Sequence, residues 1–351
     1  YVNYLKDLMV EIRSRDFDPE VDRDRLPVSD PEFLILGDRF RMDPTVDLRR
    51  RKKSLHNGIF PFEFAPGYDP ALGKEVPVGG AEWSEPILPS HTVLRMPITR
   101  TTAPDNLIET DKKIAIQIHM HYEDLSPELA EQFAPFAECA DFYISTSGKE
   151  KIKAIEDAFD DFKSVKIAVG DNVGRDVGPL ITLFKDDLSK GGYDIIGHFH
   201  SKKSLETAGE DLGKKWRTYL YKNLVGNAVQ AQWIVDQFSL LPNLGLLFPE
   251  SRHIMGWNEN FDHAQELLER IGFDPMPARL GIRFPVGTMF WGSPKILEPY
   301  WKADIKYDEY PPEPLPVDGS ILHAFERLLP VVCERQGLDW ATVYRADIEQ
   351  W

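Results

Sequence analysis

The feature that most constrains the fold is a regular alternation of strand-like and helix-like segments between residues 112 and 200. Helical patterns separate the strand-like segments, and the first begins at Ser126-Pro127-Glu128, an N-cap residue followed by proline in the first turn. Repeats of this kind predict an α/β fold, a mostly parallel, Rossmann-type sheet flanked by helices with right-handed crossovers. The apolar runs predict buried strands at residues 114–119, 142–146, 165–169 and 193–198.

The residues before and after this alternation show different sequence patterns. Proline recurs throughout residues 1–110, which excludes long helices from most of that stretch. After residue 200 the pattern becomes mostly helical. We therefore expect a Pro-rich N-terminal extension or covering subdomain at residues 1–110, and one main domain at residues 111–351.

Composition narrows the class of function. The chain has 57 acidic and 41 basic residues, a net charge of −16, which argues against nucleic acid as a partner because phosphate binding needs a basic surface. Its two cysteines, Cys139 and Cys333, exclude a disulfide scaffold and are typical of a reducing compartment. The sequence shows neither a signal peptide nor a long apolar span, so we expect a cytoplasmic protein. Because the numbering opens at Tyr1 rather than Met, other domains of a longer polypeptide are expected as partners.

Polar side chains follow each predicted strand, at the edge where open parallel sheets bind ligands. Because the strand bodies are apolar, this pattern indicates a binding cleft rather than packing alone. The four groups are His119, His121 and Tyr122; Thr146 and Ser147; Asn172, Gly174, Arg175 and Asp176; and His198, His200, Ser201, Lys202 and Lys203.

The fourth group is the most informative, because lysines, histidines and serines crowd into residues 198–204. Ammonium groups and hydroxyls in one loop predict a site for a diphosphate. A solvated basic turn is the alternative. His198 and His200 lie on one side of an extended chain and could ligate a metal, but two histidines alone are a weak metal signal.

The third group lacks a nucleotide-binding fingerprint. Neither G-x-G-x-x-G nor G-x-x-x-x-G-K-[ST] occurs in it, which argues against nicotinamide dehydrogenases and P-loop enzymes. The Asn172 amide, the Arg175 guanidinium and the Asp176 carboxylate could bind sugar hydroxyls or position a phosphate. A structural pair between Arg175 and Asp176 is the alternative.

Five motifs follow one another between residues 112 and 335. They are Asn172-x-Gly174-Arg175-Asp176, His200-Ser201-Lys202-Lys203-Ser204, Trp216-Arg217, Phe284-Pro285-Val286-Gly287-Thr288-Met289-Phe290-Trp291 and Asp318-Gly319-Ser320-x-x-His323-Ala324-x-Glu326-Arg327. Together they resemble the rhamnan synthesis protein F family of glycosyltransferases. The resemblance implies transfer of a deoxysugar, most of all rhamnose, from a nucleoside diphosphate donor, with dTDP-rhamnose expected. The acceptor it implies is a growing bacterial surface polysaccharide of the O-antigen, capsule or rhamnan type.

The resemblance also implies a GT-A-like main domain, with a nucleotide-sugar-binding half at residues 111–205 and an acceptor-side half at residues 206–351. Many enzymes of that fold hold a metal ion with an Asp-x-Asp motif after the fourth strand, where this chain has His198-x-His200. Cationic side chains can neutralise the diphosphate themselves. We therefore expect donor binding that requires no metal and no other cofactor.

An inverting transfer needs a carboxylate that takes the proton of the acceptor hydroxyl. Asp318 is the favoured base, because it lies in a loop just before the last predicted helix, and Asp176 is the second candidate. The alternative role of Asp318 is that of an N-cap residue. For Trp257 and Trp291 the alternative role is core packing. For His323 and Glu326 the alternative is a buried structural pair. The acceptor-side residues that we expect are Trp257, Thr288, Trp291, His323 and Glu326.

The partners and the class of activity have alternatives as well. The basic run at residues 49–53 indicates either a solvated surface or a peripheral contact with the inner face of the cytoplasmic membrane, where a lipid-linked glycan acceptor is expected. The alternative to an enzyme is a catalytically inactive carbohydrate- or nucleotide-sugar-binding module of a larger polysaccharide-assembly protein. A phosphate-ester hydrolase that uses His198, His200 and a metal would lack further carboxylate ligands nearby.

Overall fold

The computed structural model describes residues 68–69, 74–75, 92–96, 108–171, 173–201, 210–251, 256–276, 282–316, 318–345 and 348. The chain divides into two compact units, Tyr1–Leu88 and Pro89–Trp351. In the first unit, the described residues form an antiparallel pair, β1 (Tyr68–Asp69) and β2 (Lys74–Glu75). Most of the predicted Pro-rich extension and the basic run at residues 49–53 lie outside the described residues.

The second unit is built on an eight-stranded sheet with the strand order β3-β10-β8-β9-β7-β4-β5-β6. Strand β9 runs antiparallel to its neighbours β7 and β8, whereas the other pairs in the sheet are parallel. The predicted α/β fold with a mostly parallel sheet is therefore confirmed. The strands are β3 (Thr92–Arg95), β4 (Ile114–His119), β5 (Ala140–Thr146), β6 (Val165–Val169), β7 (Ile195–His200), β8 (Leu244–Pro249), β9 (Phe290–Gly292) and β10 (Asp339–Tyr344).

The central strands are buried on both faces, which is why they form continuous apolar runs in the sequence. All residues of β4 are buried, and Ile114 and Ile116 are at most 1% exposed. Close packing requires glycine at position 197 on β7, because a Cβ there would lie 2.7 Å from the rings of Phe199 and Trp291. Glycine therefore lets the Trp291 ring of β9 approach the backbone of β7.

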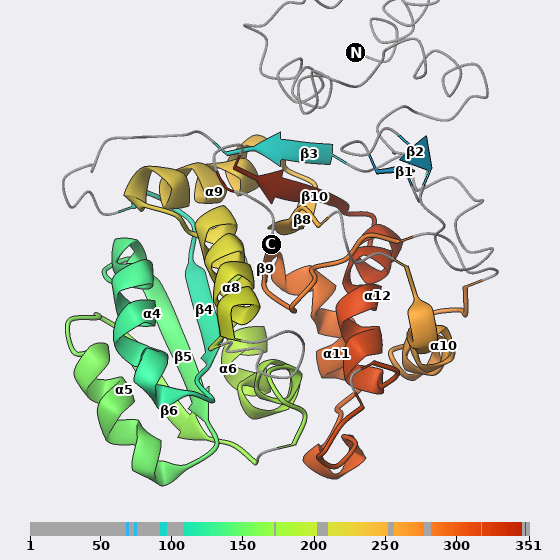
Figure 1. Ribbon diagram of the computed structural model, residues 1–351, viewed down its shortest axis with the longest axis horizontal. Helices are drawn as coiled ribbons and strands as arrows, with labels where there is room; N and C mark the ends of the chain where they lie inside the picture. The colour runs from blue at the N-terminus through green and yellow to red at the C-terminus, as the bar shows by residue number, and fades with distance from the viewer. Residues whose placement is uncertain are drawn as a thin grey trace, which may run out of the picture. The chain divides into compact units, whose positions relative to one another are not determined.

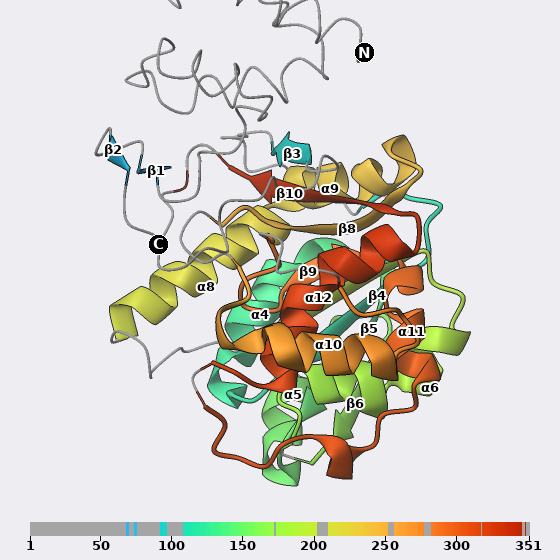
Figure 2. The ribbon, with the colours of Figure 1, turned by 90° about the vertical axis from the view of Figure 1, so that its right-hand side faces the viewer.

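Helices cover both faces of the sheet (Figure 1 and Figure 2). On one side lie α4 (Ser126–Phe133), α5 (Ile152–Ala158) and α8 (Glu210–Leu224), and on the other lie α10 (Phe261–Arg270), α11 (Glu298–Lys302) and α12 (Ile321–Arg335). A large apolar cluster joins α10, α11 and α12 to strands β8 and β10. Further helices are α6 (Lys185–Lys190) and α9 (Ala228–Leu240), and short turns of helix occur at Glu123–Leu125, Ala134–Phe136, Lys149–Lys151, Pro179–Leu183, Asn258–Asn260, Pro294–Ile296 and Tyr307–Glu309.

Three element boundaries differ from the predicted ones. Strand β5 begins at Ala140 rather than at residue 142. Strand β7 begins at Ile195 rather than at residue 193 and continues to His200, because its register is set by pairing with β4. His198 and His200 therefore belong to the strand itself and point to the same face. The sequence also predicts an extended segment at residues 283–291, but residues 283–289 are irregular and pairing is confined to Phe290–Gly292.

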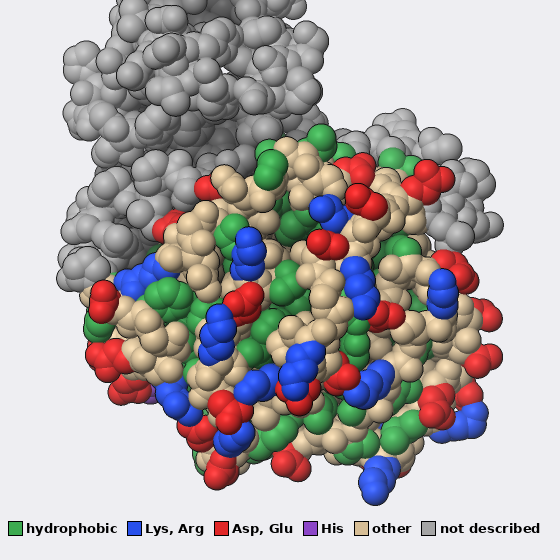
Figure 3. All heavy atoms as spheres, turned by 180° about the vertical axis from the view of Figure 1, so that it is seen from behind, with side chains coloured by type: hydrophobic (Ala, Val, Ile, Leu, Met, Phe, Trp, Pro, Cys, Tyr) green, Lys and Arg blue, Asp and Glu red, His purple; other side chains and the backbone are tan. Residues whose placement is uncertain are grey.

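The surface of the second unit carries charges of both signs. Figure 3 shows the face opposite to the view of Figure 1, where the described Lys and Arg side chains are interspersed with Asp and Glu. On the coloured part of this face, the negative charge is therefore not gathered into one patch. Among the helices that the structure describes, none is long and apolar enough to span a membrane.

Candidate functional site

The strand order of the sheet reverses between β4 and β7. Strands β5 and β6 extend the sheet from one side of β4, and β7 then pairs with the other side of β4. In open α/β sheets, ligands bind at such a switch point, outside the carboxyl ends of the strands. The two strands end side by side at His119 and His200, which are partners in the parallel register.

A hydrogen-bonded chain of side chains lies along this edge. The Nε2 atom of His198 lies 3.3 Å from Asp176 Oδ2, and its Nδ1 atom lies 2.6 Å from Gln117 Oε1. The Gln117 amide donates to Ser145 Oγ at 3.4 Å, and the same Oγ lies 2.9 Å from His119 Nδ1. The chain satisfies polar groups in a sheet interior where unpaired ones would be unfavourable.

Burial and charge set the protonation states at the two ends of this chain. Burial lowers the pKa of His119 from 6.5 to about 3, although the Asp176 carboxylate opposes the shift, so the ring is neutral at pH 7. Burial alone would raise the pKa of Asp176, but His200, His198 and His119 together hold it below its usual range. Asp176 is therefore an ionised carboxylate that contacts His198 and lies within electrostatic range of His200 and His119.

The turn after β6 has a left-handed backbone at Gly174 (φ 77°) and Arg175 (φ 46°). A Cβ at Gly174 would lie 2.9 Å from the Tyr310 ring, so glycine is required by both conformation and space. Arg175 donates from Nε and Nη2 to the two carboxylate oxygens of Glu313, at 2.9 and 3.3 Å. The sequence left open a structural pair between Arg175 and Asp176. The structure instead pairs Arg175 with Glu313 and Asp176 with His198.

The loop before β9 is held between β7 and α12. His200 donates from Nε2 to the Gly287 carbonyl at 2.7 Å. Glu326 Oε1 accepts from the N–H groups of Gly287 and Thr288 at 2.6 and 3.0 Å, and from the Thr288 hydroxyl at 3.4 Å. Because Thr288 has a φ of 55°, which disfavours a β-branched residue, these bonds stabilise a strained turn. Thr288 and Glu326 therefore lie close to His200.

Asp318 is paired and partly exposed. Its Oδ1 atom accepts from Asn260 Nδ2 at 2.7 Å and lies 3.3 Å from Arg327 Nη2, and 30% of its side chain is exposed. The N-cap of α12 is Ser320, whose hydroxyl accepts from the His323 N–H at 3.4 Å. The alternative that Asp318 caps this helix is therefore wrong.

His323 lies within electrostatic range of both candidate bases. Burial lowers the pKa of His323, while Asp318 and Asp176 both oppose the shift. Its Nδ1 atom lies 2.8 Å from Ser320 Oγ. His323 therefore lies in the first turn of α12, within electrostatic range of the turn after β6.

The loops after β4 and β7 are tied to each other. The Tyr122 N–H donates to Ser201 Oγ, and the Ser201 N–H donates to the His119 carbonyl, both at 2.9 Å. The His121 ring packs edge-on against Tyr122, with ring centroids 4.7 Å apart. These contacts bring the predicted residues of the first and fourth groups together.

Sequence reasoning missed Lys151, Gln117 and Glu313 at this edge. It placed Ser145 at the end of the second strand but gave it no role. Lys151 donates from Nζ to the His121 carbonyl at 2.6 Å and to Ser147 Oγ at 3.3 Å. Its position just after the second strand was a usable signal. Gln117 and Ser145 lie inside strands, and Glu313 lies far away in the sequence, so their roles depend on tertiary pairing.

Of the predicted residues that the structure describes, three do not take part in the observed cluster, and three further predicted residues are not described. Thr146, Trp257 and Trp291 are fully buried. Trp291 donates from Nε1 to the Leu224 carbonyl at 2.8 Å, so the tryptophans occupy the core positions that were their alternative and offer no ring face to a ligand. Asn172, Lys202 and Lys203 lie outside the described residues.

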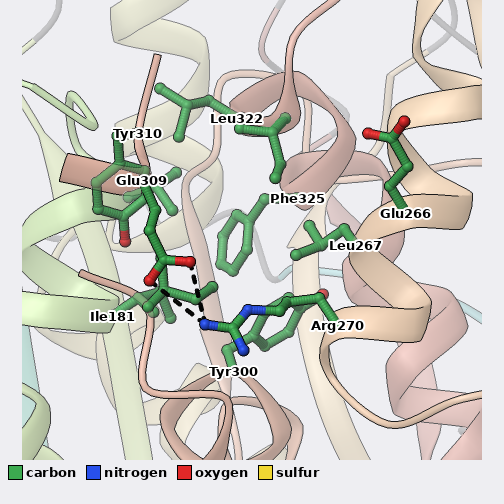
Figure 4. A pocket seen from close by; sticks show the side chains of 12 residues that line it. Ile181, Glu266, Leu267, Arg270, Tyr300, Glu309, Tyr310, Leu322 and Phe325 are labelled. Carbon is green, nitrogen blue, oxygen red and sulfur yellow. Dashed lines mark hydrogen bonds and ion pairs between the residues drawn. The ribbon is translucent and has the colours of Figure 1, made fainter. Parts of the chain in front are cut away.

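An apolar cavity of about 240 Å³ lies between α10, α12 and residues 305–310 (Figure 4). Val177, Leu267, Tyr310 and Phe325 are among its lining residues, and an ion pair between Arg270 and Glu309 spans one side. Val177 follows Asp176 directly, so the cavity adjoins the turn after β6. Within the part of the chain that the structure describes, no group of three or more His, Cys, Asp or Glu side chains is placed to hold a metal ion.

Residues 85–337 match the family described as "Rhamnan synthesis protein F". Two curated relatives from Xanthomonas campestris pv. campestris, from strains B100 and ATCC 33913, are each described as "Uncharacterized protein WxcX". Each is 26% identical over 248 residues, which are 69% of this chain and 34% of the relative. The chain thus matches about a third of the length of these relatives. The family match contains all the residues of the edge described above.

Proposed function

Because the chain belongs to the rhamnan synthesis protein F family, we propose that it is a glycosyltransferase that moves rhamnose or a related deoxysugar from a nucleoside diphosphate to a growing polysaccharide. Family membership assigns the chain to polysaccharide synthesis. The donor, the transfer reaction and the acceptor are the proposed part.

The observation that carries the proposal is the convergence of polar side chains on the switch point between β4 and β7. His119 and His200 end the two strands, and Arg175 adds a guanidinium at the neighbouring turn. Guanidinium and imidazole groups are suited to the oxygens of a diphosphate. Lys202 and Lys203 follow β7 directly in the sequence and would add positive charge. We propose that the charges of Arg175, Lys202 and Lys203 replace a metal ion. The neutral His119 imidazole then serves as a hydrogen-bonding group.

The two carboxylates have different proposed roles. Asp318 is partly exposed, so an acceptor hydroxyl can reach it, and it serves as the base of an inverting transfer. It takes the hydroxyl proton while the oxygen bonds to the anomeric carbon and the bond from that carbon to the diphosphate oxygen breaks. Asp176 has a lowered pKa and is therefore a weak base, so we assign it to holding the histidines in place.

A thermal-shift panel of nucleoside diphosphates, combined with a transfer assay with dTDP-rhamnose, tests this proposal. Thymidine diphosphate should raise the melting temperature, because a ligand that binds the native state stabilises it. Asp318→Asn should keep that shift and lower the transfer rate about 100-fold or more. Transfer by the unsubstituted protein should persist in the presence of a chelator.

The control is Asp308→Asn, which removes an exposed carboxylate from the segment before Asp318 and should leave transfer unchanged. If no nucleoside diphosphate shifts the melting temperature, donor binding is contradicted. If Asp318→Asn turns over normally, Asp318 is not the base.

A nucleotide-sugar-binding module without transfer activity is the second candidate. It is favoured by His198-x-His200 at the position where many GT-A-like enzymes carry Asp-x-Asp. Binding of thymidine diphosphate without transfer or donor hydrolysis would support this candidate over the enzyme.

A further inference from the structure

The segment between α11 and α12 forms ion pairs with the rest of the unit through its own carboxylates. We call residues 304–316 the strap. Each ion pair joins an acidic residue of the strap to a basic residue of an earlier element. The pairs are Asp304 with Lys185, Glu309 with Arg270 and Glu313 with Arg175.

The pair between Glu313 and Arg175 differs from the others, because it lies at the ligand-binding edge of the sheet. Arg175 directly precedes Asp176, and its guanidinium donates to both oxygens of Glu313. The Leu315 N–H also donates to Glu313 Oε2, at 2.9 Å. A forked guanidinium with an added backbone N–H is a donor set that suits phosphate as well as carboxylate.

The charges of Arg175 and Glu313 influence the pKa values of histidines at the site. The pKa of His121 is lowered by burial first, and Arg175 lowers it further while Glu313 opposes the shift. Arg175 also acts in the same direction on the pKa of His323, where burial is again the largest cause. The guanidinium therefore lies within electrostatic range of one ring from the donor-side group and one from the acceptor-side group.

The ion pair between Arg175 and Glu313 is also accessible to a ligand that could displace the Glu313 carboxylate. The side chains of Arg175 and Glu313 are 39% and 32% exposed, so a ligand can reach them, and exposed ion pairs contribute little to stability. The apolar cavity shown in Figure 4 lies against Glu309 and Tyr310 of the strap. A cavity leaves the strap with fewer packing contacts on that side than a filled core would give.

We propose that the Glu313 carboxylate is an internal ligand of an anion site on Arg175, and that the diphosphate of the donor displaces it. This inference rests on the proposed function. A diphosphate carries more negative charge and more acceptor oxygens than a carboxylate, so the same guanidinium binds it more strongly. Because Glu313 fills the site in the free protein, it lowers the apparent affinity for the donor. Displacement also frees the strap close to Asp318, which couples donor binding to the acceptor side.

Calorimetric titration with thymidine diphosphate at fixed ionic strength tests this inference in Glu313→Gln. Glutamine removes the charge but keeps an oxygen that can accept from the Leu315 N–H, so the strap retains that bond. The Kd should fall about fivefold or more, because the competing carboxylate is gone. In an Arg175→Gln background, the same substitution should give no gain, since the two residues act as a pair.

The matched control is Glu298→Gln, which removes the same charge from a surface ion pair with Lys302 on α11. An equal gain in this control would mean that only net charge matters, and would overturn the inference. An unchanged or higher Kd in Glu313→Gln would overturn it too, while leaving donor binding intact. If neither the unsubstituted protein nor Glu313→Gln binds thymidine diphosphate, the proposed function itself fails, and the inference fails with it.

Discussion

At the residue scale, the site combines a neutral buried imidazole with an ionised carboxylate. His119 and Asp176 could be predicted as edge residues, because His119 closes an apolar run and Asp176 lies in the polar turn that follows another. Their connection through Gln117 and Ser145 could not be predicted, because it depends on the register of three strands that are distant in the sequence. Asp318 was correctly expected to lie before a helix, but the cap is Ser320, since only the folded loop shows which oxygen reaches the His323 N–H.

The lowered pKa of His119 gives a prediction for stability against pH. Its folded pKa is about 3, against 6.5 for an ordinary histidine, so the unfolded chain binds a proton between these values that the folded chain does not. The free energy of unfolding should therefore fall as the pH drops from 7 to 5, by about 2 kcal/mol from this group. His119→Asn should remove that part of the fall, as measured by urea unfolding at both pH values.

The control for this prediction is His263→Asn, which removes a partly exposed histidine from α10. This variant should lose as much stability between pH 7 and pH 5 as the unsubstituted protein. If His119→Asn loses that amount too, His119 is not the group responsible.

At the scale of elements, the strands that follow one another along the chain with helices between them were predictable, whereas the short length and antiparallel pairing of β9 were not. Its three residues are too short to show a periodicity, and both of its pairings are antiparallel and non-local. Gly197 was a weak signal of it, because a glycine inside a strand often marks the close approach of another group. The partner, the Trp291 ring, is visible only in the folded sheet.

Gly197→Ala tests the packing between β7 and β9. The new methyl group would lie 2.7 Å from the Phe199 and Trp291 rings, in a sheet that is buried on both sides. Overpacking of this kind should lower the free energy of unfolding by about 1–3 kcal/mol, as measured by urea unfolding. Val169→Ala, on the exposed edge strand β6, should change it by less than about 0.5 kcal/mol. Equal effects of the two substitutions would contradict the packing argument.

At the scale of the whole molecule, the fold class followed from the alternation between residues 112 and 200, because that pattern is local and repeated. The acceptor side could be predicted less well. Its motifs lie in loops whose partners, such as Glu326 for the Gly287 turn, are set by the packing of α12. Because the net charge is −16, the proposed donor site would need local positive charge to attract an anionic ligand.

Hydrogen–deuterium exchange of the chain with and without thymidine diphosphate tests most directly where the donor binds. A donor site at the β4–β7 switch point predicts slower exchange after β4, β5, β6 and β7, at residues 120–122, 147–151, 174–176 and 201. Bound phosphate oxygens and ordered loops both reduce amide opening there. Unchanged exchange in these loops, or protection confined to the cavity between α10 and α12, would contradict a donor site at the β4–β7 switch point.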